Sequence, residues 1–195
     1  MKKNIAVLVA AFAVLLVAAK PSSAATEIYF NITEPPIPGE VTAKAYHNQI
    51  QLLSFTQSVQ APAAQGSGAG GLSAGKGSCG PITMTKYVDK SSPLLIKAVM
   101  TGEHIQNAVV SFVDTQTPGQ GATSGRGGAR NDYTVTLTDA LFTSVQQSDA
   151  SPAELIESVS LVASQFTITY VPTNTGGAAS GPVTVNVNCA TNTVN

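Results

Sequence analysis

Apolar and polar residues alternate along a series of short segments, each bounded by proline, glycine or small polar residues. In 27–32, for example, Ile28, Phe30 and Ile32 fall on one face of an extended chain. The same period of two recurs in 47–59, 82–87, 105–114, 132–145, 158–162, 165–171 and 183–188. A period of two is typical of β-strands with one buried face. The sequence therefore predicts a mainly β fold, a small antiparallel barrel or sandwich.

One short helix is expected to flank these strands. The Ser92 hydroxyl is suited to cap its first turn, Pro93 suits the first helical position, and Gly102 suits the end. The apolar stripe between these signals consists of Leu94, Leu95, Ala98 and Val99. Because a helix this short is marginal alone, we expect packing against the sheet to hold it.

Two glycine-rich segments, 61–77 and 115–130, interrupt the strands. Small, flexible residues bury little surface, so both segments are predicted to be long loops. Residues 71–75 match the G-x-S-x-G pattern around a nucleophilic serine, Ser73, and 70–76 match part of a phosphate-binding loop. Neither match has the strand before it and the helix after it that such sites need. A hydrolase that uses Ser73 therefore remains only an alternative.

No catalytic, cofactor-binding or metal-binding residues are predicted elsewhere. The two histidines, His47 and His104, have no Cys, His or carboxylate at the spacing of a metal site. Composition also argues against nucleic acid as a partner, because phosphate binding needs a surplus of basic residues and the formal net charge is −1.

The first 25 residues resemble a secretory signal peptide. Lys2 and Lys3 precede an apolar run from Ile5 to Ala19, and small residues follow at 22–25. The run is shorter than the ~20 apolar residues of a membrane-spanning helix, although a retained anchor is the alternative. We therefore expect export to the periplasm or beyond, and no stable membrane span after cleavage.

Cys79 and Cys189 are the only cysteines. In an exported chain, disulfides form and persist, so the two are predicted to pair. Two free buried thiols are the alternative.

A longer motif lies around the predicted helix. The run Thr-Lys-x-x-Asp-x-x-Ser-Pro-x-Leu occupies 85–95, and a Gly-x-His follows at 102–104. The matching residues are Thr85, Lys86, Asp89, Ser92, Pro93, Leu95, Gly102 and His104. This run resembles the signature of the haemolysin-coregulated protein (Hcp) family, the tube protein of bacterial type VI secretion. The strands at 50–55, 157–161 and 166–172 resemble further parts of that family.

The resemblance implies a small β-barrel with a side helix that assembles into hexameric rings. Such rings stack into a tube that carries effector proteins and meets a spike protein, a role without catalytic residues. The segment 61–77 would correspond to the family's extended loop, which contacts neighbouring rings. Its candidate stacking residues are Gly66, Gly70, Leu72 and Lys76.

The chain departs from the family pattern at both ends. We expect a signal peptide over 1–25, an Hcp-like domain over 26–172 and a tail with an extra strand over 173–195. Family members are made without a cleavable signal, so the resemblance implies ring assembly more directly than injection. An exported monomeric β-barrel that serves as a binding or surface module is the alternative.

Overall fold

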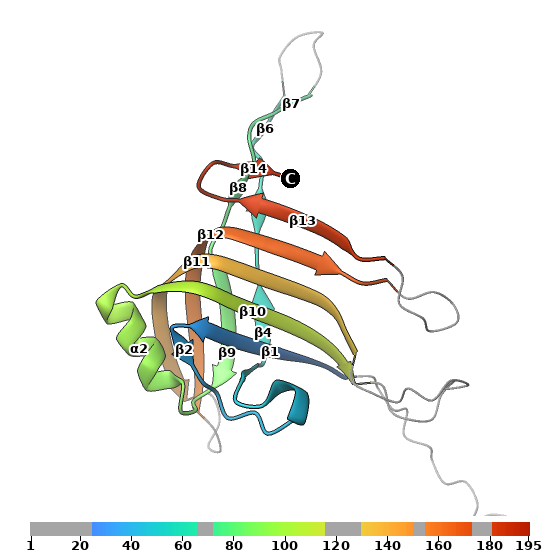
Figure 1. The fold of residues 1–195 in the computed structure, drawn as a ribbon. Coiled ribbons are helices and arrows are strands. Elements are labelled where there is room, and N and C mark those ends of the chain that lie inside the picture. The colour runs from blue at the N-terminus through green and yellow to red at the C-terminus, as the bar shows by residue number, and fades with distance from the viewer. Residues whose placement is uncertain (1–24, 66–71, 116–129, 150–154, 173–180) are drawn as a thin grey trace, which may run out of the picture.

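The computed structural model describes residues 25–65, 72–115, 130–149, 155–172 and 181–195. Within these ranges the chain forms a ten-stranded sheet, two separate two-stranded ladders and a single α-helix (Figure 1). All strand pairs are antiparallel. The predicted fold class, mainly β with one flanking helix, is confirmed.

Seven strands of the large sheet follow one another as hydrogen-bonded neighbours. In order they are β14 (Thr193–Val194), β13 (Val183–Asn188), β12 (Leu155–Tyr170), β11 (Arg130–Asp149), β10 (His104–Thr115), β1 (Ala25–Glu34) and β2 (Pro36–Ile37). The other three strands are β3 (Ile50–Leu52), which pairs with β1, and β4 (Ser54–Thr56) and β9 (Ile82–Tyr87), which pair with each other; β9 also pairs with β12.

The segment 50–56 links β1 to β9, two strands of the large sheet that do not pair with each other. Its first half, β3, pairs with β1, and its second half, β4, pairs with β9. We expected one strand over 47–59, but the structure interrupts it at Leu53, whose N–H donates to the Thr85 carbonyl at 2.7 Å. The Leu53 side chain faces outward, whereas that of Leu52 is buried. The interruption therefore accommodates two adjacent leucines in one extended segment. The sheet thereby wraps around one core.

The core consists of the inward-facing residues of these strands. Its fully buried members include Ile50, Ala108, Val110, Val135, Leu137 and Val159, each with 0% exposure. We expected 158–162 and 165–171 to be two strands, but β12 runs through both without a break. The reason is that β11 lies beside it throughout, with Ala140 opposite Ala163, so the small residues stay in register.

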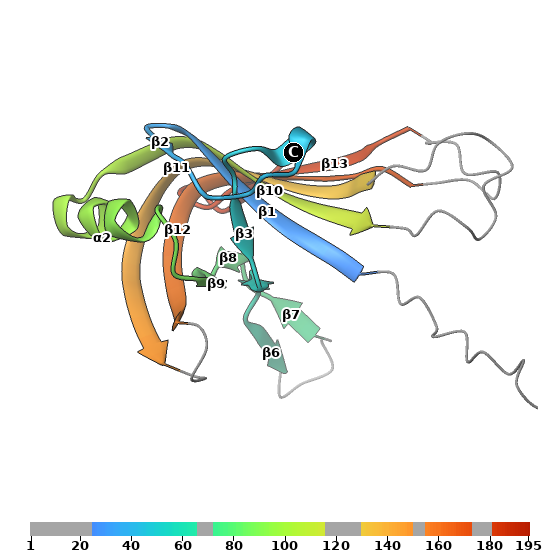
Figure 2. The same cartoon turned by 90° about the horizontal axis from the view of Figure 1, so that it is seen from below.

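The helix α2 (Ser92–Thr101) lies at one side of the sheet, next to β11 (Figure 2). Leu95 and Ala98 are buried, whereas Leu94 of the predicted stripe is 37% exposed. Gly102 ends the helix with a φ of 64°, a left-handed conformation that favours glycine. A short 3-10 helix, η1 (Lys44–Tyr46), precedes β3.

The first glycine-rich segment contains strands and is not only a loop. Within it, β6 (Ala63–Gln65) pairs with β7 (Leu72–Ala74). Directly on either side of it, β5 (Val59–Gln60) pairs with β8 (Ser78–Cys79). Main-chain hydrogen bonds need no particular side chain, which is why a glycine- and alanine-rich sequence still forms a ladder. We call these four strands the arm; its β6–β7 end projects away from the large sheet (Figure 1). Most of the second glycine-rich segment, 116–129, lies outside the described residues.

Candidate functional site

The centre of the sequence motif is a buried lysine. Lys86 alternates inward on β9 with Ile82 and Met84, and its side chain is 1% exposed. Its Nζ donates to Glu157 Oε1 at 2.8 Å and to Asp89 Oδ1 at 2.7 Å. Further acceptors are the Tyr87 carbonyl at 2.7 Å and Ser92 Oγ at 3.2 Å. Burying a charge is costly unless it is paired, and here every donor of the ammonium group has an acceptor.

The Ser92 hydroxyl belongs to this cluster. It accepts from the Asp89 N–H at 3.1 Å and donates to Glu157 Oε1 at 2.8 Å. The predicted cap was therefore wrong: Ser91 is the N-cap residue, and no side-chain hydrogen bond caps the helix. Instead, Asp89 Oδ1 accepts from the Ser91 N–H at 2.9 Å and orders the turn before the helix. Lys86, Asp89, Ser92 and Glu157 thus join β9, the start of α2 and β12.

The remaining motif residues also make internal contacts. Thr85 Oγ1 lies 2.6 Å from Ser54 Oγ, across the β4–β9 pair. Pro93 occupies the first helical turn, and Leu95 is buried in the core. The sequence motif is therefore a structural device, because its polar members are partnered within the chain. Sequence reasoning missed Glu157 as the partner of Lys86, since 71 residues separate them.

His104 lies at the surface where β10 begins. Its Nδ1 is 2.7 Å from Asp139 Oδ1, and Ser164 Oγ donates to Asp139 Oδ2 at 2.7 Å. The hydrogen bond from His104, followed by that from Ser164, lowers the pKa of Asp139 below its usual value. His104 and Ser164 thus both bond to the carboxylate of Asp139, whereas in a catalytic triad the serine bonds to the histidine. The group therefore joins β10, β11 and β12 without activating a nucleophile.

A pocket of about 320 Å³ opens between β1, the segment before η1 and the turn after β9. Its lining includes Glu27, Tyr29, Glu40 and Asp89. Burial, together with the hydrogen bond and charge of Glu27, raises the pKa of Tyr29 to about 12. Three carboxylates and a neutral phenol make this pocket unsuited to phosphate groups.

The G-x-S-x-G pattern around Ser73 does not lie between a strand and a helix, as a nucleophilic serine would. Ser73 lies in β7 of the arm, which leads into β8 and not into a helix. Among the described residues, no three His, Cys, Asp or Glu side chains gather as a metal site would require. In the same ranges, no helix is long and apolar enough to cross a membrane.

The predicted stacking residues fall on or near the arm. Leu72 begins β7, opposite Gln65 of β6, and Lys76 is exposed between β7 and β8. Gly66 and Gly70 lie outside the described residues. The arm strands pair among themselves and with none of the ten strands of the large sheet, as far as the described residues show. They therefore present unpaired strand edges to the surroundings.

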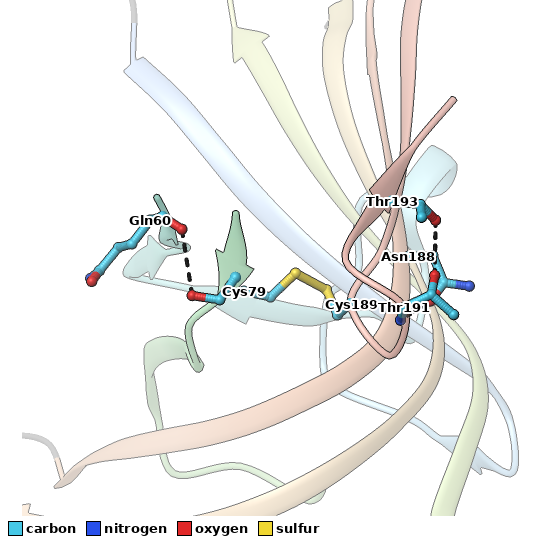
Figure 3. Close-up of a disulfide and its surroundings, with 7 residues drawn as sticks. Gln60, Cys79, Asn188, Cys189, Thr191 and Thr193 are labelled. Carbon is cyan, nitrogen blue, oxygen red and sulfur yellow. Dashed lines mark hydrogen bonds between the residues drawn. A yellow bond between two sulfur atoms is a disulfide. The ribbon is translucent and has the colours of Figure 1, made fainter. Parts of the chain in front are cut away.

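Cys79 and Cys189 form the predicted disulfide, with Cα atoms 5.6 Å apart (Figure 3). Cys79 ends β8 at the base of the arm, and Cys189 directly follows β13. Both side chains are partly buried and pack against the core. The bond therefore links the arm, the last strands and the main sheet.

Comparisons with known proteins agree with this architecture. The fold resembles a solved structure described as a type six secretion system protein, with a TM-score of 0.73 at 21% identity, over 88% of this chain and 100% of the other. It also resembles Hcp1 from Salmonella typhimurium, with a TM-score of 0.67 at 22% identity, over 88% of this chain and 99% of the other. A type VI secretion system effector from Yersinia pestis has a TM-score of 0.59 at 22% identity, over 83% of this chain and 98% of the other. At these identities the likeness establishes the fold.

A search of curated protein sequences finds no match. A model of the family described as type VI secretion system effector, Hcp, matches residues 29–170. That range covers more than two thirds of the 195 residues and includes the whole motif around α2. The chain therefore belongs to the Hcp family of type VI secretion system effectors.

Proposed function

We propose that this chain is an exported structural subunit that forms hexameric rings, and that the rings stack into tubes that carry effector proteins. It acts as a conduit and carrier and has no catalytic role. Family membership supports the ring-forming role, and solved relatives described as Hcp proteins share the fold. Residues 1–25, read as a signal peptide, support export.

The observation that carries this proposal is the arm. Its strands project from the sheet and hydrogen-bond to one another, which leaves two edges open in the described structure. An exposed strand edge is a template for pairing with another chain. A subunit with such an arm suits contact between stacked rings, and the arm occupies the segment that the family resemblance assigned to that contact.

The disulfide favours a second candidate, an exported binding module that works as a monomer. A bond between Cys79 and Cys189 suits an oxidising compartment, whereas a contractile injection apparatus is loaded from the cytoplasm. The two candidates differ in oligomeric state, so one measurement separates them.

The test uses the chain without residues 1–25, purified with its disulfide intact. Size-exclusion chromatography with light scattering should give a particle of six chain masses, and electron microscopy should show rings. A variant with 61–77 replaced by a short turn should still give rings but few stacks. A single chain mass at high protein concentration would overturn the ring proposal and support the monomeric module.

A further inference from the structure

Two strands share one edge of β12 and follow one another along it. Asn188, which ends β13, lies opposite Gln165, and Ile82, which begins β9, lies opposite Leu161. Both strands run antiparallel to β12, so the end of β13 points toward the start of β9. Only residues 162–164 of β12 separate the two paired stretches.

The disulfide spans this junction. Cys189 follows β13 at once, and its N–H donates to the Ser164 carbonyl at 2.8 Å, inside the gap. Cys79 lies three residues before β9. The bond between Cys79 and Cys189 (Figure 3) therefore links the end of β13 to the segment just before β9, 110 residues away in the sequence. Along the β12 edge these two strands are consecutive.

The arm leaves the body at the same point. At its base, Val59 pairs with Cys79, and the Gly80 N–H donates to the Ser58 carbonyl at 2.8 Å. Val59 is 56% exposed, whereas Cys79 packs against the core. The arm strands form ladders separate from the large sheet, and the chain runs from β4 into β5 and from β8 into β9. The disulfide adds a third covalent link at the base, from Cys79 to the residue after β13.

We propose that the Cys79–Cys189 disulfide fixes the direction of the arm, and that the arm so held docks on a second copy of this chain in the next ring. This inference rests on the proposed ring-and-tube function and adds its regulation. An arm that is fixed before docking loses less conformational freedom when it binds, which strengthens the contact. Rings form with or without the disulfide, whereas stacking depends on it.

The chemistry of the bond couples stacking to export. Formation joins the two Sγ atoms and releases two protons and two electrons, which reduce a disulfide-bearing oxidant to its dithiol. A dithiol reverses the step: one thiolate attacks an Sγ, the protein S–S bond breaks, and the reagent closes to its own disulfide. In a reducing compartment the two thiols stay reduced and the disulfide does not form. Stacks therefore grow after the chain reaches an oxidising compartment.

The test compares three samples of the chain without residues 1–25: oxidised, reduced with dithiothreitol, and C79S/C189S. Circular dichroism confirms the fold of each sample. Electron microscopy should show rings in all three, with ring-to-ring association about tenfold weaker in the two samples without the bond, as expected when an interface loses the preorganisation of one arm. In the variant with 61–77 shortened, reduction should leave the ring-to-ring association unchanged.

Hydrogen exchange gives a second, assembly-independent readout. Amides at the base of the arm, such as Gly80, should exchange faster after reduction, while those of the β11 core stay protected. Rings that stack equally with and without the bond would overturn this inference alone, as would unchanged exchange at the base of the arm. Absence of rings from every sample would overturn the proposed function and the docking step with it.

Discussion

Lys86 Nζ lies 2.8 Å from Glu157 Oε1, and the two side chains are 1% and 0% exposed. Lys86 comes from β9 and Glu157 from the paired stretch of β12, where the two residues lie directly opposite. The helix start joins the same group through Ser92. The family motif around α2 thus acts as a clamp between a strand pair and a helix.

Replacing Lys86 with Met should destabilise the protein strongly. The change leaves the buried Glu157 carboxylate without its cation, which costs about 3–5 kcal/mol in comparable buried pairs. The free energy of unfolding in urea measures the loss. The double variant K86M/E157Q should recover part of it, because no unpaired charge stays at position 157. A loss below about 1 kcal/mol for K86M would contradict a clamping role.

Removing the disulfide should lower stability without changing the fold. The bond closes a loop with a sequence separation of 110, and the chain-entropy model predicts a contribution of about 4–5 kcal/mol for such a loop. C79S, C189S and the double variant should have equal denaturant midpoints, all below the oxidised protein. Thiol titration in denaturant should detect two thiols only after reduction. Two thiols without reductant would show that the bond does not form.

The contact between His104 and Asp139 should make stability depend on pH in the acid range. Because the folded-state pKa of Asp139 is lowered from its ordinary 3.8, its contribution is complete above that value. The contribution is lost as the pH falls through the folded pKa. The difference in unfolding free energy between wild type and D139N should therefore shrink as the pH falls below 3.8. Asn suits this position because Asp139 has a φ of 52°. A difference that grew as the pH fell below 3.8 would refute the assignment.

Replacing Gly102 with Ala should weaken the end of α2. Gly102 has a φ of 64°, where a Cβ costs roughly 1–2 kcal/mol in a left-handed conformation. A Cβ there meets no atom within 4 Å, so backbone strain alone accounts for the loss. G102N should lose less, because Asn tolerates this conformation better. Thermal or urea unfolding measures both variants, and equal losses would point to a cause other than backbone strain.

Shortening 61–77 should separate assembly from folding. The arm contributes no strand to the large sheet in the described structure, so the unfolding midpoint should stay close to that of the full chain. Stacked rings should become rare in electron micrographs. Loss of folding would instead show that the arm belongs to the core structure.

Local patterns in the sequence were enough to identify most strands and the helix. The alternation in 27–32, 82–87 and 183–188 corresponds to β1, β9 and β13, because a period of two reports which face is buried. The motif also identified Lys86 and Asp89 as important. Its Ser92 was misread as a cap, because capping is the usual local use of serine and the competing partner, Glu157, lies 65 residues away.

Strand partners and breaks depended on long-range packing. Nothing local shows that 61–77 pairs with itself, that β12 continues through Ala163, or that the chain interrupts a strand at Leu53. Each outcome depends on a neighbouring strand that supplies or withholds main-chain partners. The link between Asp139 and Ser164 was missed for the same reason, since it joins two strands across the sheet.

Composition and periodicity thus established a mainly β chain with one helix and a cysteine pair suited to export. They could not show that β13 and β9 lie end to end on β12, or that the disulfide closes this junction at the base of the arm. The physical reason is that alternation specifies the face each side chain occupies. The choice of neighbouring strand, by contrast, is made by contacts between residues far apart in the chain.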